Sequence, residues 1–469
     1  MLTFPGNPIR HCDEVTRRGF LKAGSLGIAG FSLADLLRAE TAADTGSSHK
    51  AVINIHLDGG PPQMDMIDIK KDVPIEYRGE LESIPTRISG FHVSELMPRT
   101  ASIADKLIFI RSLVGAASRH DAFQCLSGFD AKDLASIGGR PAMGCVINKL
   151  MGTPKDPIPA YIDLLQGRPL ARNSARPGFL GPSFKSFRPD ISKLFHRELE
   201  KAMQKELANL GSSHTTSMSL EEGITVGRLD DRMGLLKGLD RLSAAIDRSG
   251  YMEAMDKFTQ QAFNILTSGS FAEAMDLDRE DPKIVERYTL RMKSKGERFY
   301  TSDEPKATLK FLLARRLVEA GVRVVSLSIS DFDTHKYNYP RMRDTIPIFD
   351  HGLHALITDL DERGMLDDVT IVAWGEFGRT PKLNKDGGRD HWPRVGMAMM
   401  AGGGMRAGQV IGSTDRFAGE ADSRPVHYQD IMATLYHNLG IDPRQTTIMD
   451  PTGRPRYLVE QGQPISEII

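Results

Sequence analysis

The fold is decided by one stretch of the chain: Val369-Thr370-Ile371-Val372-Ala373-Trp374-Gly375-Glu376-Phe377-Gly378-Arg379-Thr380-Pro381. Its first six residues form an apolar, β-branched run, which is typical of a buried strand. The remaining residues form a glycine-rich loop that holds one carboxylate and one guanidinium. In α/β proteins ligands bind beyond the carboxyl ends of strands. We therefore expect Glu376 and Arg379 to lie at the binding edge of a sheet.

Further strands and helices are predicted on both sides of this stretch. Apolar runs predict strands at residues 50–57, 107–110, 322–329 and 395–401. A helix is predicted at residues 348–363, with Pro347 at its start, and another at 430–439. Residues 152–190 are predicted to be loops, and residues 194–320 are predicted to be mostly helical. This order predicts an α/β fold, with a doubly wound, mostly parallel sheet and a helical insertion.

The expected organisation has four parts. Residues 1–43 are a signal segment, 44–193 and 321–469 are the two halves of the α/β core, and 194–320 are the helical insertion. A length of 469 residues is too great for one simple core. The net charge of -1 provides no basic field for nucleic acid. The body of the chain contains no long apolar run, so no internal membrane span is predicted. The sequence leaves the oligomeric state open.

The N-terminus has the pattern of a twin-arginine export signal. Arg17 and Arg18 precede a mildly apolar, Gly/Ala-rich run at residues 23–33, and residues 39–43 offer small side chains for cleavage. This predicts a periplasmic or secreted protein. An amphipathic N-terminal helix is the alternative. Of the three cysteines, Cys12 precedes the paired arginines, and neither Cys125 nor Cys145 lies in a CxxC or Cys/His cluster, which argues against a structural zinc site.

Carboxylates and imidazoles gather near the predicted strand ends. The candidate metal ligands are Asp58, Asp65, Asp333, His335, Glu376, Asp390 and His391. Such side chains are what a divalent cation needs from a protein. The sequence therefore predicts a metal-dependent site at the rim of the sheet. Its leading use would be hydrolysis of phosphate or sulfate esters.

Some of these residues also have a structural interpretation. Asp58 precedes two glycines and could cap a turn, and Asp333 could do the same. His391 could bond to its neighbour Asp390. Glu376 follows a buried strand, and an unpaired buried carboxylate costs several kcal/mol. A metal or Arg379 is therefore expected to compensate the charge of Glu376.

Six phrases carry a resemblance to a known family. They are Gly59-Gly60-Pro61, Asp65 with Asp68, Asp333-Thr334-His335, residues 375–381, residues 388–393 and residues 401–404. They resemble a bacterial family of largely twin-arginine-exported proteins, the domain of unknown function 1501, along nearly the whole chain. That family is similar in its core to the alkaline phosphatase and sulfatase superfamily. The resemblance implies a sheet of alkaline-phosphatase-like type and hydrolysis of phosphate or sulfate esters.

The resemblance to the superfamily also implies metal ligands. Asp333 and His335 match an Asp/His pair that holds one metal, and His391 matches the histidine that completes this site. Glu376 stands in place of the aspartate of an Asp-His pair. Phe377 stands in place of its histidine, so one ligand of the second metal is lost. The implied cofactor is one or two divalent cations, with Zn, Mn and Ca all allowed.

The remaining roles follow from the same resemblance. Asp58 holds the place of the metal ligand after the first strand, and Ser118 holds the place of the nucleophile. A water is the alternative nucleophile. His120 is either a helper of the nucleophile or a surface residue, and Arg379 would offset charge in the transition state. A non-catalytic metal-binding or assembly protein on the same fold is the alternative function.

Overall fold

The apolar run after Lys50 forms β1 (Ala51–Leu57), an inner strand of the main sheet. The computed structural model describes residues 50–469, except for residues 137, 154–155, 157, 198, 210–268 and 293–301. Within this part of the chain the main sheet has eight strands, in the order β11-β4-β10-β7-β1-β6-β5, with β14 also paired to β4. The other strands are β4 (Leu107–Val114), β5 (Tyr161–Leu164), β6 (Val324–Ile329), β7 (Val369–Trp374), β10 (Gly396–Ala401), β11 (Gln409–Ile411) and β14 (Val426–His427).

The direction of each strand decides which loops meet. All pairings in the main sheet are parallel except those of β10 with β4 and β7. The predicted α/β fold with a mainly parallel sheet is therefore confirmed. The carboxyl ends of β7, β1 and β6 lie side by side at one edge. Because β10 runs the other way, its amino end reaches that same edge.

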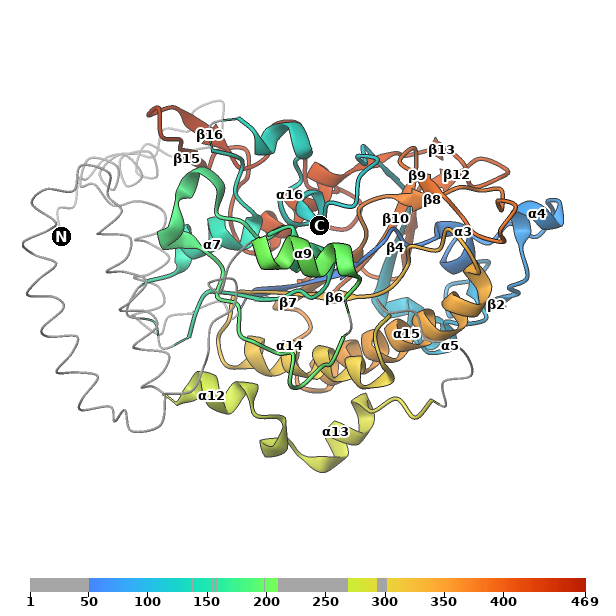
Figure 1. Cartoon of the computed structure of the whole chain (residues 1–469), viewed down its shortest axis with the longest axis horizontal. Coiled ribbons are helices and arrows are strands. Elements are labelled where there is room, and N and C mark those ends of the chain that lie inside the picture. Colours follow the sequence, from blue (N-terminus) through green and yellow to red (C-terminus); the bar gives the residue numbers. More distant parts are fainter. Residues whose placement is uncertain are drawn as a thin grey trace, which may run out of the picture. The chain divides into compact units, whose positions relative to one another are not determined.

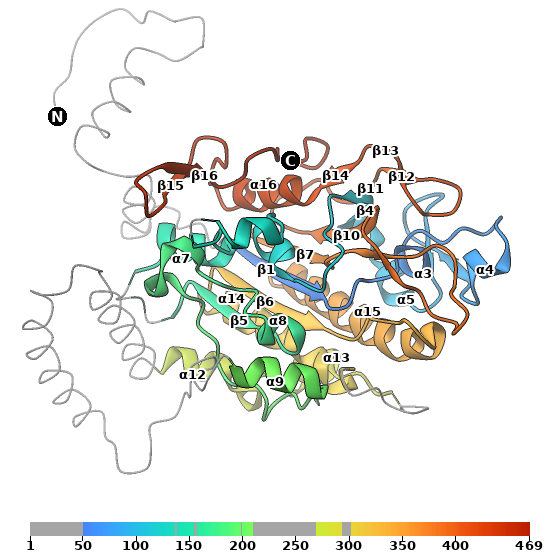
Figure 2. The same cartoon turned by 45° about the horizontal axis from the view of Figure 1, so that its top comes forward.

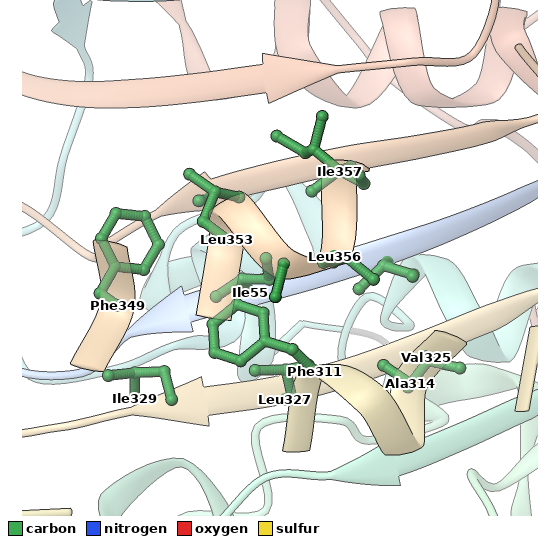
Figure 3. Packing of buried hydrophobic residues seen from close by; sticks show 14 of the residues in the cluster. Ile55, Phe311, Ala314, Val325, Leu327, Ile329, Phe349, Leu353, Leu356 and Ile357 are labelled. Carbon is green, nitrogen blue, oxygen red and sulfur yellow. The ribbon is translucent and has the colours of Figure 1, made fainter. Parts of the chain in front are cut away.

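Helices cover both faces of this sheet. α14 (Leu309–Glu319) and α15 (Asn338–Glu362) lie on one face, and α7 (Met143–Met151) and α16 (Tyr428–Asn438) lie on the other (Figures 1 and 2). On the first face Ile55, Phe311 and Leu353 pack together from β1, α14 and α15 (Figure 3). Val52 belongs to the core of the opposite face. Since side chains alternate along a strand, His56 shares the face of Val52.

Shorter elements complete the described chain. The helices are α3 (Gln63–Met66), α4 (Ile75–Arg78), α5 (Pro98–Ser102), α6 (Phe123–Ser127) and α8 (Arg168–Ala171). The two-stranded pairs are β2 (Ser83–Pro85) with β3 (His92–Ser94), β8 (Gly378–Arg379) with β9 (His391–Trp392), β12 (Ser413–Thr414) with β13 (Ala421–Ser423), and β15 (Thr447–Met449) with β16 (Pro455–Tyr457).

Two local predictions were wrong. α15 begins at Asn338, well before the predicted start, and Pro347 lies inside the helix. A proline in a helix removes one backbone hydrogen bond, and here the extensive buried face of α15 offsets that loss. Residues 161–164, predicted to be a loop, form β5 and pair in parallel with β6. The surrounding prolines and glycines concealed this short strand.

The predicted insertion at residues 194–320 is described only in part, since residues 210–268 and 293–301 lie outside the described residues. Its described helices are α9 (Lys201–Asn209), α12 (Ser270–Met275), α13 (Pro282–Tyr288) and α14. α14 packs against β6 and α15 in the main core. The predicted signal segment at residues 1–43 also lies outside the described residues. No described helix combines the length and apolar character needed to cross a membrane.

Candidate metal centre at the edge of the sheet

Four side chains form a first set, which we call the histidine group: His120, Asp333, His335 and His391. One ligand-type atom of each lies within 4.8 Å of those of the other three. His120 follows β4, while Asp333 and His335 follow β6. His391 precedes the antiparallel β10. The sheet therefore brings together residues that lie far apart in the sequence.

Asp333 is the centre of the histidine group. Its Oδ1 lies 3.1 Å from Nε2 of His335 and 3.7 Å from Nε2 of His391. These two nitrogens are 3.1 Å apart. The Oδ2 of Asp333 lies 3.2 Å from Nε2 of His120. Ligand atoms about 2.1 Å from one shared ion lie roughly 3.0–3.4 Å apart, so this spacing fits one divalent cation.

The protonation states of two members of the histidine group, Asp333 and His391, also fit metal ligands. Burial would raise the pKa of Asp333, but the neighbouring His120 and His391 and the charge of Arg379 outweigh it and hold that pKa below its usual range. The neighbouring carboxylate of Asp333 raises the pKa of His391, but burial and the positive charges of His120 and Arg379 outweigh it, so the net shift is downward. An anionic carboxylate and a neutral imidazole are the forms that bind metal.

Three buried side chains form a second set, the acidic group: His56, Asp58 and Glu376. His56 Nε2 and Glu376 Oε2 lie 3.3 Å apart. Despite this short distance, neither atom makes a well-directed hydrogen bond within the described residues, and His56 Nδ1 also lacks one. Buried polar atoms without partners are costly and rare. A cation between these side chains would satisfy Nε2 of His56 and Oε2 of Glu376.

His120 joins the two groups. Its Nδ1 lies 2.8 Å from Glu376 Oε1, and its Nε2 points to Asp333. Burial would lower the pKa of His120, but the hydrogen bonds to Asp333 and Glu376 outweigh it and raise the pKa to about 9. The ring is only 13% exposed. The structure therefore places His120 between the groups, and the surface alternative is wrong.

A glycine allows the loops that carry the two groups to pack closely. Gly59 follows Asp58 and has a φ of +107°. A Cβ atom built on it would lie 2.4 Å from the backbone nitrogen of Asp333. Only glycine accepts both this conformation and this approach. The backbone nitrogen of Gly59 also donates to Oε1 of Glu376, at 3.0 Å.

Arg379 lies beside the histidine group and contacts Asp333. Its side chain is fully buried and pairs with Asp333 at 2.8 Å. Its other donors bond to the backbone oxygens of Gly59, Gly60 and Arg389. These contacts hold the guanidinium of Arg379 against the carboxylate of Asp333. The close contacts of Glu376 come from His120 and the backbone amide of Gly59 rather than from Arg379.

Three other candidates lie outside both groups. Asp65 pairs with the buried Arg389 at 2.8 and 2.9 Å and accepts a hydrogen bond from Asn338. Asp390 lies behind His335, 2.6 Å from its Nδ1. A proton on Nδ1 that is donated to Asp390 leaves the Nε2 lone pair free for a cation. Ser118 is exposed two residues before His120, and its hydroxyl has no hydrogen-bond partner among the described residues.

Sequence reasoning missed three residues of this centre. His56 was taken only as part of the first strand, yet a histidine inside a buried β-branched run is itself unusual. Arg168 follows β5 and contacts Asp333 at 2.8 Å, and Arg197 contacts Asp58 at 3.2 Å. No spacing in the sequence indicates these two contacts, because they depend on how distant loops pack.

Two solved structures are similar to this chain at low identity and low TM-score. No curated protein matches the chain. A solved structure of the PsFucS1 sulfatase from Pseudoalteromonas sp. is 11% identical, with a TM-score of 0.34, covering 88% of this chain and 72% of that one. The phosphonate monoester hydrolase of Agrobacterium radiobacter is 13% identical, with a TM-score of 0.34, covering 89% of this chain and 76% of that one.

A family model gives the relationship directly. The model described as "Protein of unknown function (DUF1501)" matches residues 49–469, which include every residue of the two groups. The chain belongs to the DUF1501 family.

Proposed function

We propose that the chain is an exported, metal-dependent hydrolase of phosphate or sulfate esters. The observation that supports this most is the convergence of the histidine group and the acidic group at one edge of the sheet. The acidic group is buried, whereas the side chain of His335 is 45% exposed. A substrate can therefore approach from the side of the histidine group while the acidic group stays shielded from water.

Apart from His120, the residues of the two groups would hold one or two divalent cations. Such a cation, when bound, supplies a Lewis acid for a phosphoryl or sulfuryl oxygen. The imidazole-rich donor set favours Zn or Mn over Ca. Arg379 and Asp390 would fix the orientation of Asp333 and His335, and His120 would hold a proton between Asp333 and Glu376. Ser118 or a water would be the nucleophile.

Glu376 gives a direct test of the acidic group. We expect Glu376→Gln to weaken metal binding by roughly ten- to a hundredfold, because the amide keeps the shape but loses the charge. Isothermal titration measures this change. Glu95→Gln, which removes a carboxylate paired with Arg343 elsewhere, is the control and should leave metal binding unchanged. A lowered melting temperature with unchanged metal affinity would remove Glu376 from the ligand set.

The hydrolase proposal predicts both metal and turnover. We expect the purified protein to contain a stoichiometric divalent metal and to hydrolyse an aryl phosphate or an aryl sulfate. Chelation should abolish the activity, and adding Zn or Mn should restore it. Elemental analysis and a chromogenic ester assay measure the two properties on one sample. Protein that contains neither metal nor activity would contradict the proposal.

The alternative is a non-catalytic metal-binding or assembly protein. It is favoured by Ser118, whose hydroxyl makes no hydrogen bond to His120 or to any other described residue. A nucleophilic serine normally contacts the base that activates it. The same experiment separates the two proposals, since bound metal without turnover on either ester would support the alternative.

Export is proposed from the paired arginines of the N-terminus. We expect the double substitution Arg17→Lys with Arg18→Lys to leave the protein in the cytoplasm, because the arginine pair is what the translocase reads. Fractionation followed by immunoblotting measures the location. Lys22→Arg, which keeps the pair and the positive charge of the region, should still be exported. Export of the double variant would show that the segment is not a twin-arginine signal.

A further inference from the structure

Fixed charges in and around the two groups cancel. The carboxylates are Asp58, Asp331, Asp333, Glu376 and Asp390, and the positive charges are those of Arg168, Arg197, Arg341, Arg379 and the protonated His120. Arg197 pairs with Asp58, Arg341 with Asp331, and Arg379 with Asp333. The imidazoles add no negative charge. A divalent cation that entered this centre alone would therefore leave it with excess buried positive charge, which is costly.

Arg168 lies between the two groups. It begins α8, and its Nη2 lies 2.8 Å from Oδ2 of Asp333 in the histidine group. Its Nη1 lies 3.9 Å from Asp58 in the acidic group and 3.6 Å from Asp331. The side chain is only 9% exposed, yet Nη1 makes no hydrogen bond within the described residues. A buried guanidinium thus carries an unused donor toward the centre.

Arg197 approaches the acidic group from another segment. Its Nη2 lies 3.2 Å from Oδ2 of Asp58, its side chain is 2% exposed, and its Nε has no hydrogen-bond partner within the described residues. Gly167, at a φ of +70°, makes room for it, because a Cβ there would lie 2.6 Å from Nη2 of Arg197. Gly167 therefore leaves space for the guanidinium of Arg197, which lies beside Asp58 as that of Arg168 does.

We propose that Arg168 and Arg197 exchange partners when the centre is loaded. Without a cation they neutralise Asp333 and Asp58; when a divalent cation takes these carboxylates, the released guanidiniums bind a tetrahedral dianion, such as a phosphate or sulfate group. This inference rests on the proposed metal site. The planar fork of arginine matches such anions. Because the charge of the anion offsets the charge of the cation, binding of one ion raises the affinity of the centre for the other. This coupling of the two affinities is reciprocal.

The test measures Mn²⁺ binding to the full chain with and without an oxyanion. Mn²⁺ affinity is measured from the electron paramagnetic resonance signal of the free ion, in sodium sulfate and in sodium chloride at equal ionic strength. We expect binding about tenfold tighter in sulfate, within the usual range of coupling between two sites. Equal affinity in the two salts would overturn the inference while leaving the metal site intact. Absence of Mn²⁺ binding in both salts would overturn the metal site, and the coupling with it.

A substitution of Arg168 separates exchange from a structural role. We expect Arg168→Gln to bind Mn²⁺ more tightly than the unchanged protein in chloride, because a competing positive charge is gone. In the same variant the advantage of sulfate should fall severalfold. A residue with only a structural role would weaken binding in both salts, which would contradict the proposal. Arg111→Gln is the matched control, since Arg111 pairs with Asp68 outside both groups and should leave both affinities unchanged.

A second variant, Gly167→Ala, tests the proposal even if Arg168→Gln fails to fold. Gly167→Ala would push the guanidinium of Arg197 away from Asp58 while leaving every charge in place. We expect this variant to show a smaller sulfate advantage than the unchanged protein. Circular dichroism confirms that each variant is folded before Mn²⁺ is titrated. An undiminished sulfate advantage in the folded Gly167→Ala protein would exclude Arg197 from anion binding.

Discussion

Replacing Asp333 with asparagine should cost the histidine group its cation. Asp333 contacts three imidazoles and two guanidiniums, and no other described carboxylate belongs to this group. We expect metal affinity to fall by at least roughly a hundredfold, more than the loss typical of residues that only orient a ligand. Ester hydrolysis should fall with it. Titration of metal into folded, metal-free protein measures the effect.

Asp390→Asn is the matched comparison for Asp333→Asn. Asp390 contacts the same histidine, His335, but on its Nδ1 side, away from the centre of the group. We expect only about a tenfold loss of metal affinity, because the amide oxygen can still accept the hydrogen bond that orients the ring. If Asp390→Asn lost as much affinity as Asp333→Asn, the position of Asp390 behind His335 would be wrong.

Replacing Asp65 with alanine should strongly destabilise the protein without removing its metal. Asp65 and Arg389 form a bidentate pair in which both side chains are fully buried. Removing one partner leaves a buried charge without compensation, which costs about 3–5 kcal/mol. The free energy of unfolding, measured by denaturant titration, should fall by this amount. Metal content per folded molecule should stay the same.

Glu82→Ala sets the scale for that loss. Glu82 pairs with Arg78 on the surface at 3.9 Å, and such exposed pairs contribute at most about 1 kcal/mol. A similar loss of stability in both variants would contradict the buried pairing of Asp65. Metal loss from Asp65→Ala at unchanged stability would instead return Asp65 to the ligand set that the sequence predicted.

The elements that the sequence predicted best are those with the strongest local signal. β7 was predicted with its observed bounds because residues 369–374 are buried and mostly β-branched or apolar. β5 was missed because four residues among prolines and glycines carry little periodic signal. The early start of α15 was missed because proline usually begins a helix, whereas here it lies inside one.

The same distinction holds for the candidate site. The sequence by itself determined that carboxylates and imidazoles follow the ends of several strands, because strand periodicity and polar residues are local properties. It could not choose between Asp58 and Asp65, since both are buried acids near the end of β1. Only the tertiary structure paired Asp65 with Arg389 and left Asp58 beside His56 and Glu376.

Strand direction is the physical reason why the sequence did not predict the remaining contacts of the candidate site. His391 reaches Asp333 because β10 is antiparallel to its neighbours, and the direction of a strand leaves no trace in its own residues. The contacts of Arg168 and Arg197 arise in the same way, from loops that meet only after the sheet has formed. The sequence thus determined the chemical types present at the edge, and the tertiary structure decided which of them lie close enough to one another to bind a common cation.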